Sequence, residues 1–329
     1  MSDHGERQVL FFDLYVEANG FEGRYGVVRG LSPVPMERLG EMIGQLFKHK
    51  KLPMRSNRSD SETTYLSDMG FHDGKKLLCL LFNRSDTRAA DLVITDPRKS
   101  SRRRVVKDTG EGHDYSAHLL IKTAPIKPNT YHCLLEVANG LPGSRVQKFL
   151  NLLARLLSKE FKAEMSVPHI NGATDKNGKP KMLNRRHKIK LKGHPSPSFL
   201  LELQRGELGS VDLIEDRKRV QNWDGNNYLV EKSKTVKLIP AGQTKPGQVV
   251  DVIKGVAALA DTRKYDRMRI RYKTLEGMRR IAAIETQTFQ MAADELFIRK
   301  EPIRNFTDKL PTSFDKMHLE VVQRMAVYL

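Results

Sequence analysis

The stretch NRRHKIKLK, residues 184–192, alternates cationic and apolar side chains, and this alternation is typical of a β-strand with two unlike faces. One face would carry Arg186, Lys188, Lys190 and Lys192, and the other would carry His187, Ile189 and Leu191. The apolar face can pack on a core, whereas the cationic face must meet water or an anion. We therefore predict an amphipathic strand whose outer face is suited to a negatively charged partner.

The same pattern recurs in DRMRIRYKT, residues 266–274, and more weakly in VEKSKTVKL, residues 230–238. The cations in phase are Arg267, Arg269, Arg271 and Lys273 in the first of these, and Lys232 and Lys234 in the second. Like charges along one strand repel each other, so folding alone does not favour this arrangement, and a bound polyanion would relieve it. The alternative interpretation is a solvated basic face, since lysine is also common on edge strands.

The whole chain is strongly basic. Its 329 residues include 57 Lys and Arg against 39 Asp and Glu, a formal net charge of +18. Residues 1–164 hold 26 basic and 20 acidic side chains, net +6, and residues 165–329 hold 31 and 19, net +12. Such a charge indicates a polyanionic partner, nucleic acid first and an anionic membrane surface second. We expect the binding site in the second half.

The element pattern predicts an α+β fold, with mixed or antiparallel sheets and a few packed helices in two domains. QVLFFDLYVEA and KLLCLLFNR are expected strands, and SRVQKFLNLLARLLSKEF is the clearest helix. Residues 312–329 are expected as a closing helix, with Thr312 and Asp315 spaced as a capping box. The stretch 171–184 has two Asn-Gly pairs, a proline and few apolar residues, and it is the expected linker between domains at 1–170 and 185–329.

The basic segments favour contact with a nucleic-acid backbone over stacking on bases. Aromatic residues are 7% of the chain, and the basic strands contain only Tyr272. A further basic loop would add Arg102, Arg103 and Arg104. Sequence-independent binding of double-stranded DNA fits these features best, and an RNA-binding ribonucleoprotein component is an alternative.

Two stretches raise the question of catalysis. EGHDYSAH offers Glu111, His113, Asp114 and His118, with His132 on the next strand, as metal or acid–base candidates. VDLIEDRKR contains Asp212, Glu215, Asp216 and Lys218, and carboxylates followed by a lysine are what a metal-dependent nuclease uses. A polar turn and a polar strand end explain these residues equally well. We expect a binding protein rather than an enzyme, without a cofactor, and keep the nuclease as an alternative.

The remaining features concern the cellular setting. Cys79 and Cys133 lie in apolar, strand-like stretches and are expected to be reduced core residues. The polar start of the chain lacks the apolar stretch of a signal peptide, and no apolar run is long enough to cross a membrane. The sequence therefore predicts a soluble, cytoplasmic protein without direct membrane insertion.

Residues 235–282 also resemble a known family. Their order is a TVK strand, a proline-containing loop, an amphipathic helix ending near Ala-Asp, a basic strand and a second basic segment, and this order is similar to that of the phage-lambda exclusion sensor. The resemblance implies an antiviral-defence protein that binds DNA without strong sequence preference, as a homodimer, and triggers a membrane or effector protein. The residues it assigns to DNA are Lys237, Arg267, Arg269, Arg271, Lys273, Arg279 and Arg280.

Overall fold

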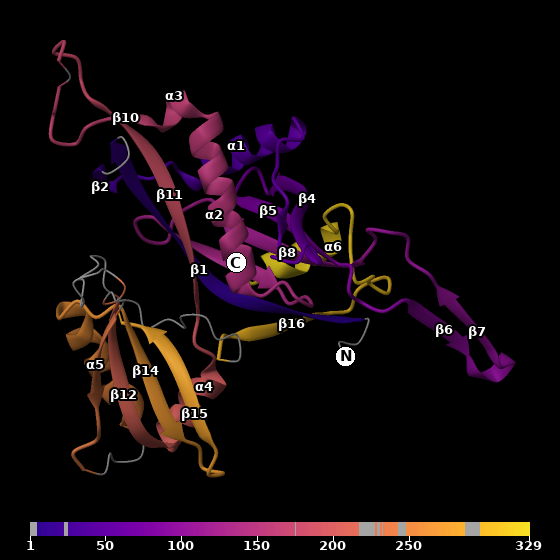
Figure 1. Ribbon diagram of the computed structural model, residues 1–329. Coiled ribbons are helices and arrows are strands. Elements are labelled where there is room, and N and C mark those ends of the chain that lie inside the picture. The colour runs from indigo at the N-terminus through magenta and orange to yellow at the C-terminus, as the bar shows by residue number, and fades with distance from the viewer. Residues whose placement is uncertain are drawn as a thin grey trace. The chain divides into compact units, whose positions relative to one another are not determined.

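The structure is a computed structural model that describes residues 5–22, 26–174, 176–216, 228, 231, 233–242, 248–286 and 297–329. The chain forms two compact units (Figure 1). Met1–Leu191 and Glu301–Leu329 make the first, and Lys192–Lys300 make the second. Both combine sheets with helices, so the predicted α+β class is confirmed.

The first unit contains a ten-stranded sheet. Its main path runs β10-β11-β1-β9-β8-β5-β4-β3, and β2 and β16 also pair with β1. The strands are β1 (Glu6–Glu22), β2 (Gly26–Leu31), β3 (Arg55–Ser56), β4 (Glu62–His72), β5 (Leu77–Asp86), β8 (His113–Lys122), β9 (Thr130–Glu136), β10 (Ser166–Pro168), β11 (Met182–Gly193) and β16 (Lys300–Arg304). The expected strand at 8–18 is confirmed as part of β1, and the one expected at 76–84 is confirmed as β5, which begins one residue later at Leu77.

The centre of this sheet is covered on both faces, which explains the unbroken apolar run of β5. Helices α1 (Met36–Lys48) and α2 (Gly143–Glu160) lie on one face, where the rings of Phe82 and Phe149 meet edge to face at 5.5 Å. On the other face, Val9 and Cys79 pack with Val321 and Met325 of α6 (Leu319–Ala326). The short helix α3 (Lys162–Met165) follows α2. Cys79 and Cys133 are both buried and unbridged, as expected.

The closing helix is shorter than expected, because the segment before it makes side-chain bonds to the sheet instead of helical ones. The backbone N–H of Phe314 donates to Ser116 Oγ at 2.7 Å, and that of His318 donates to His118 Nε2 at 3.0 Å. The α6 helix therefore begins at Leu319, with His318 rather than Thr312 as its N-cap. The predicted capping box is wrong, because tertiary acceptors replace the first helical turns.

The second unit contains a four-stranded antiparallel sheet in the order β13-β12-β14-β15. Its elements are β12 (Glu207–Asp216), β13 (Ser233–Leu238), β14 (Arg267–Lys273), β15 (Arg279–Glu285), α4 (Pro197–Arg205) and α5 (Val249–Thr262). Phe199 of α4 lies edge-on against Tyr272 of β14, and α4 also contacts α5. The helix α4 therefore covers one face of β14, and the strand residues that alternate with Tyr272 point to the other face.

A separate two-stranded ribbon belongs to the first unit (Figure 1). It consists of β6 (Leu92–Asp96), the short 3₁₀ turn η1 (Pro97–Lys99) and β7 (Ser101–Val105). At its base, Asp91 binds the guanidinium of Arg104 at 2.7 Å and the backbone N–H of Lys107 at 3.3 Å. We call residues 92–105 the arm. An isolated two-stranded ribbon is only marginally stable in water.

The units have other bounds than the domains expected from the sequence. The chain leaves the first unit after Leu191, within β11, and returns to it at Glu301, within β16. Residues 171–184, the expected linker, lie in the first unit, where β11 already begins at Met182. The expected division into domains at 1–170 and 185–329 stays a prediction. Among the helices in the described parts of the chain, none is both long and apolar enough to span a membrane.

Candidate nucleic-acid interface

The face of the second unit's sheet opposite α4 is the strongest candidate, and we call it the open face. Its central strand β14 alternates as the sequence predicts. Met268, Ile270 and Tyr272 are at most 2% exposed. Between them, Arg269 and Lys273 are exposed, and Arg267 and Arg271 are half-buried. The single aromatic ring of β14 therefore packs in the core and is not available to stack on a base.

Two of the four β14 cations are already paired with carboxylates of the neighbouring strand. Arg271 Nη1 lies 2.6 Å from Asp212 Oδ2, and Arg267 Nη2 lies 2.7 Å from Asp216 Oδ1. Asp212 and Asp216 both lie on the open face because β12 also alternates with a period of two. These ion pairs therefore engage two of the four cations that the sequence pattern assigns to the outer face of β14.

The other cations of the open face have no carboxylate partner within the described ranges. They are Lys237 of β13, Arg269 and Lys273 of β14 and Arg279 of β15. In the antiparallel register, Lys273 lies directly opposite Arg279, and Arg269 and Lys237 flank Asp212 from either side. A cross-strand pair of like charges costs folding free energy. These four exposed side chains are the part of the predicted interface that the fold leaves accessible.

Two residues of the predicted set, Arg280 and Lys234, do not belong to this face. Arg280 lies on the α4 side, where its Nε is 3.1 Å from Glu202 Oε1. Lys234 lies opposite Glu215 in the register, so it alternates away from Lys237. Lys232 is outside the described residues. Arg279 and Arg280 were predicted together because the sequence does not reveal which of two adjacent arginines points to which face of the sheet.

Strand β11 of the first unit keeps the predicted alternation, but its cations are largely engaged. His187, Ile189 and Leu191 are buried, as expected. On the other face, the guanidinium of Arg186 stacks 4.3 Å from the ring centroid of Phe21, and Lys190 Nζ lies 3.7 Å from Glu17 Oε2. Lys188 is exposed, but Lys192 is only 8% exposed and is not a surface contact. The available charge of this strand is thus smaller than predicted.

The arm offers a second basic surface. Arg102 and Arg103 are exposed and have no carboxylate partner in the described part of the chain, whereas Arg104 is paired with Asp91. Arg98 and Lys99 of η1 add two further exposed cations at the tip. A two-stranded ribbon is narrow enough to enter the major groove of DNA. The basic loop predicted at 102–104 is therefore a strand of an exposed hairpin.

The geometry does not assemble the alternative nuclease site. Asp212 and Asp216 are four residues apart on one strand, which separates their Cα atoms by ~13 Å, and each is held by an arginine. Glu215 points to the opposite face, and Lys218 lies outside the described residues. A metal-dependent nuclease needs its carboxylates to converge on one ion. Among the described residues, neither aspartate belongs to a group with ligating geometry.

The histidines and acids around residues 111–118 do not form a metal or acid–base site either. His118 is fully buried, with Nδ1 2.6 Å from Glu136 Oε2 while Nε2 accepts the N–H of His318. An acceptor role at Nε2 requires the neutral imidazole, so Nδ1 carries the proton and donates to Glu136. Asp114 is likewise engaged in the fold, because its Oδ2 accepts a hydrogen bond from the Asn83 amide at 2.7 Å. These groups fix the C-terminal segment on the sheet.

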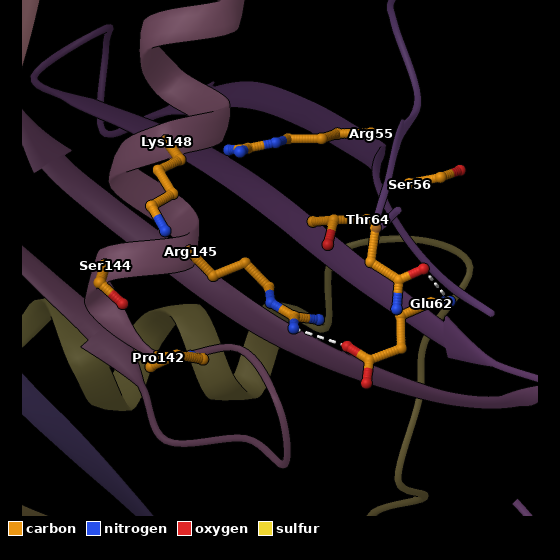
Figure 2. Close-up of a pocket in the computed structure, with 9 residues that line it drawn as sticks. Arg55, Ser56, Glu62, Thr64, Pro142, Ser144, Arg145 and Lys148 are labelled. Carbon is orange, nitrogen blue, oxygen red and sulfur yellow. Dashed lines mark hydrogen bonds and ion pairs between the residues drawn. The ribbon is translucent and has the colours of Figure 1, made fainter. Parts of the chain in front are cut away.

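A cationic cavity was missed by sequence reasoning. It has a volume of about 310 Å³ and lies between the β3–β4 hairpin and the first two turns of α2 (Figure 2). Its cations are Arg55, Arg145 and Lys148, and we call it the β3–α2 pocket. The stretches that line it are about 80 residues apart and neither is unusually basic, so no local pattern could have indicated it.

The comparisons with known proteins add no assignment to this geometry. No protein-family model matches the chain, and no curated protein matches it.

Proposed function

We propose that this chain binds double-stranded DNA through the phosphate backbone, without strong sequence preference, and acts as the DNA-sensing component of a phage-exclusion system. The observation that carries the proposal is the set of four exposed cations on the open face, namely Lys237, Arg269, Lys273 and Arg279. Ammonium and guanidinium groups at strand spacing can each neutralise a phosphate, and the released counterions favour binding.

Duplex DNA is preferred over single strands because the open face lacks stacking platforms. Single-strand binders place bases on exposed aromatic rings. The ring of Tyr272 is 2% exposed on the opposite side, and β12, β13 and β15 contain no aromatic residue. Contacts to phosphates position a protein on DNA but do not read its sequence. The proposed contacts are to phosphates, which every DNA sequence shares, so the proposed binding is sequence-independent.

The arm supports the same proposal. Arg102 and Arg103 are exposed on β7, which pairs with β6, and they can contact the phosphates that border a groove. The resemblance of residues 235–282 to the phage-lambda exclusion sensor adds the biological setting, a homodimer and a membrane or effector partner. These last parts of the proposal rest on the resemblance alone.

The test is gel retardation with duplex DNA, single-stranded DNA and RNA of equal length across a salt series. The triple variant Arg269→Ala, Lys273→Ala, Arg279→Ala should weaken duplex binding for every sequence and flatten the log–log salt slope by roughly 0.9 for each lost contact. Lys234→Ala, on the opposite face of the same sheet, is the matched control and should leave the slope unchanged. Undiminished binding by the triple variant would refute this interface, and a preference for RNA would move the proposal to A-form RNA.

A further inference from the structure

We propose that the β3–α2 pocket is a binding site for a small phosphate-bearing anion, such as the phosphates of a nucleotide. This inference concerns the first unit and is independent of the DNA interface proposed on the second. Its basis is a concave cavity into which three cationic side chains reach from two walls, with the hydroxyl-bearing side chains of Thr64 and Ser144 also in its lining (Figure 2).

The electrostatics of the pocket leave an unbalanced positive charge. Its one lining carboxylate, Glu62, is shared among three guanidiniums. Arg145 Nη2 lies 2.6 Å from Glu62 Oε2, Arg84 Nη2 lies 3.2 Å from Oε1, and Arg88 is bound to the same oxygen. Arg145 first and Arg84 second lower the pKa of Glu62 to about 2, so its carboxylate is charged at neutral pH. Asp86 also binds two of these guanidiniums, that of Arg84 at 2.5 Å and that of Arg88 at 3.6 Å. Two carboxylates therefore face three guanidiniums, and an incoming anion would neutralise the remaining positive charge.

Two further cations of the pocket are uncommitted. Arg55 and Lys148 are exposed, and neither has a carboxylate or hydrogen-bond partner within the described residues. Figure 2 shows Arg55 extending from β3 toward Lys148 on α2, so like charges converge on one space. Like charges held close together cost free energy unless an anion lies between them. Arginine in particular presents a planar set of donors that matches phosphate oxygens.

The size and lining of the pocket define the class of ligand. A volume of about 310 Å³ is at the lower end of the range for small-molecule sites, and it exceeds what a single ion needs. The lining is polar apart from Pro142, and none of its residues is aromatic, so a base or other flat apolar group would find no stacking surface. A compact polyanion with several acceptor oxygens, a diphosphate above all, satisfies the donors that converge there.

The experiment is isothermal titration calorimetry of the full chain with sodium pyrophosphate, against sodium chloride at matched ionic strength. The wild type should bind pyrophosphate saturably, and the double variant Arg55→Ala, Lys148→Ala should lose at least about tenfold in affinity. Arg155→Ala is the matched control, because Arg155 is an exposed cation on the same helix about two turns beyond Lys148 and does not line the pocket. It should bind as the wild type does. Unchanged thermal unfolding in chloride shows that the variants fold.

Two results would overturn the proposal: a wild type that shows no saturable binding, or a double variant that binds pyrophosphate as tightly as the wild type. A free nucleotide and the terminal phosphate of a nucleic-acid strand share the required chemistry. Duplexes with a 5′-phosphate or a 5′-hydroxyl distinguish these sources, since only the first would lose affinity in the double variant. The open-face triple variant should keep its pyrophosphate binding, so failure of one proposal leaves the other intact.

Discussion

Strands β11 and β14 have the same sequence pattern, in which four cations alternate with three inward residues. The two strands differ in how many of these cations are engaged by other side chains. In β11, Phe21 and Glu17 engage Arg186 and Lys190, and Lys192 is buried. In β14, the neighbouring strand pairs two cations, and Arg269 and Lys273 remain exposed without a carboxylate partner in the part of the chain that the structure describes. Alternation thus determines which way a side chain points, whereas the adjacent strand determines whether its charge is available.

The largest expected effect separates the two strands in DNA binding. The triple variant Arg269→Ala, Lys273→Ala, Arg279→Ala should lose roughly a hundredfold in affinity for duplex DNA at low salt, because three accessible phosphate contacts disappear. Arg186→Ala with Lys190→Ala should lose less than about threefold, since these cations are already engaged. Fluorescence anisotropy with a labelled duplex measures both. Equal losses in the two variants would contradict the distinction between the strands.

The second prediction concerns the pH dependence of stability, which we attribute to the buried His187 of β11. His187 is 5% exposed, and its Nε2 accepts the N–H of Val34 at 3.0 Å. Burial first, and the charge of Arg185 second, lower the pKa of His187 to about 4 from its usual 6.5. Between these values the unfolded chain binds the proton and the folded chain does not, so stability falls as the pH decreases from about 6.5 to about 4 and is then level. The full loss is up to about 3 kcal/mol.

Urea denaturation at pH 7.0, 5.5 and 4.5 measures this effect. His187→Leu should show a flatter pH dependence than the wild type over this window, even though the loss of the Val34 acceptor lowers its stability at pH 7. His49→Leu, which removes an exposed histidine, should leave the pH dependence unchanged. If the His187 variant keeps the wild-type slope, the buried neutral imidazole is not its source.

The third prediction distinguishes paired from unpaired cations within β14. Arg271→Ala should destabilise the chain by about 1–2 kcal/mol, because it leaves the 5%-exposed Asp212 without its partner. Arg269→Ala, two residues away on the same face, should change stability by less than about 0.5 kcal/mol. Chemical denaturation of the two variants measures the difference. Adding Asp212→Asn to Arg271→Ala should recover part of the loss, and no recovery would show that the ion pair is not responsible.

The smallest expected effect is a change in stability on replacing cations of the outer face of β11. Arg186→Leu removes the stacking of the guanidinium on Phe21 and should lower stability by about 0.5–1 kcal/mol. Lys188→Leu, on the same face without an aromatic partner in the described residues, should cost less. A double-mutant cycle with Phe21→Leu isolates the interaction. A coupling free energy near zero would mean that Arg186 is as available to an anion as Arg269.

Predictions from the sequence succeeded where a feature depends on nearby residues in the chain. The alternation of β11 and β14, the helix at α2 and the burial of Cys79 and Cys133 all follow from the spacing of apolar residues. The predictions failed where a segment distant in sequence provides the hydrogen-bond acceptors instead. The expected capping box at Thr312 is absent because Ser116 and His118 bind the preceding backbone, and these acceptors lie about 200 residues earlier in the chain.

The same distinction between local and distant causes applies to the candidate sites. The amino-acid sequence alone determined that the chain is basic, that its fold is α+β and that two strands present rows of cations. Only the tertiary structure decided which cations are neutralised, because Asp212 and Arg271 meet through strand register rather than sequence proximity. The β3–α2 pocket was likewise decided by packing, since Arg55 and Lys148 converge only when the β3–β4 hairpin lies beside α2. Charge and periodicity are properties of a linear chain, whereas the pairing of charges is a property of its three-dimensional contacts.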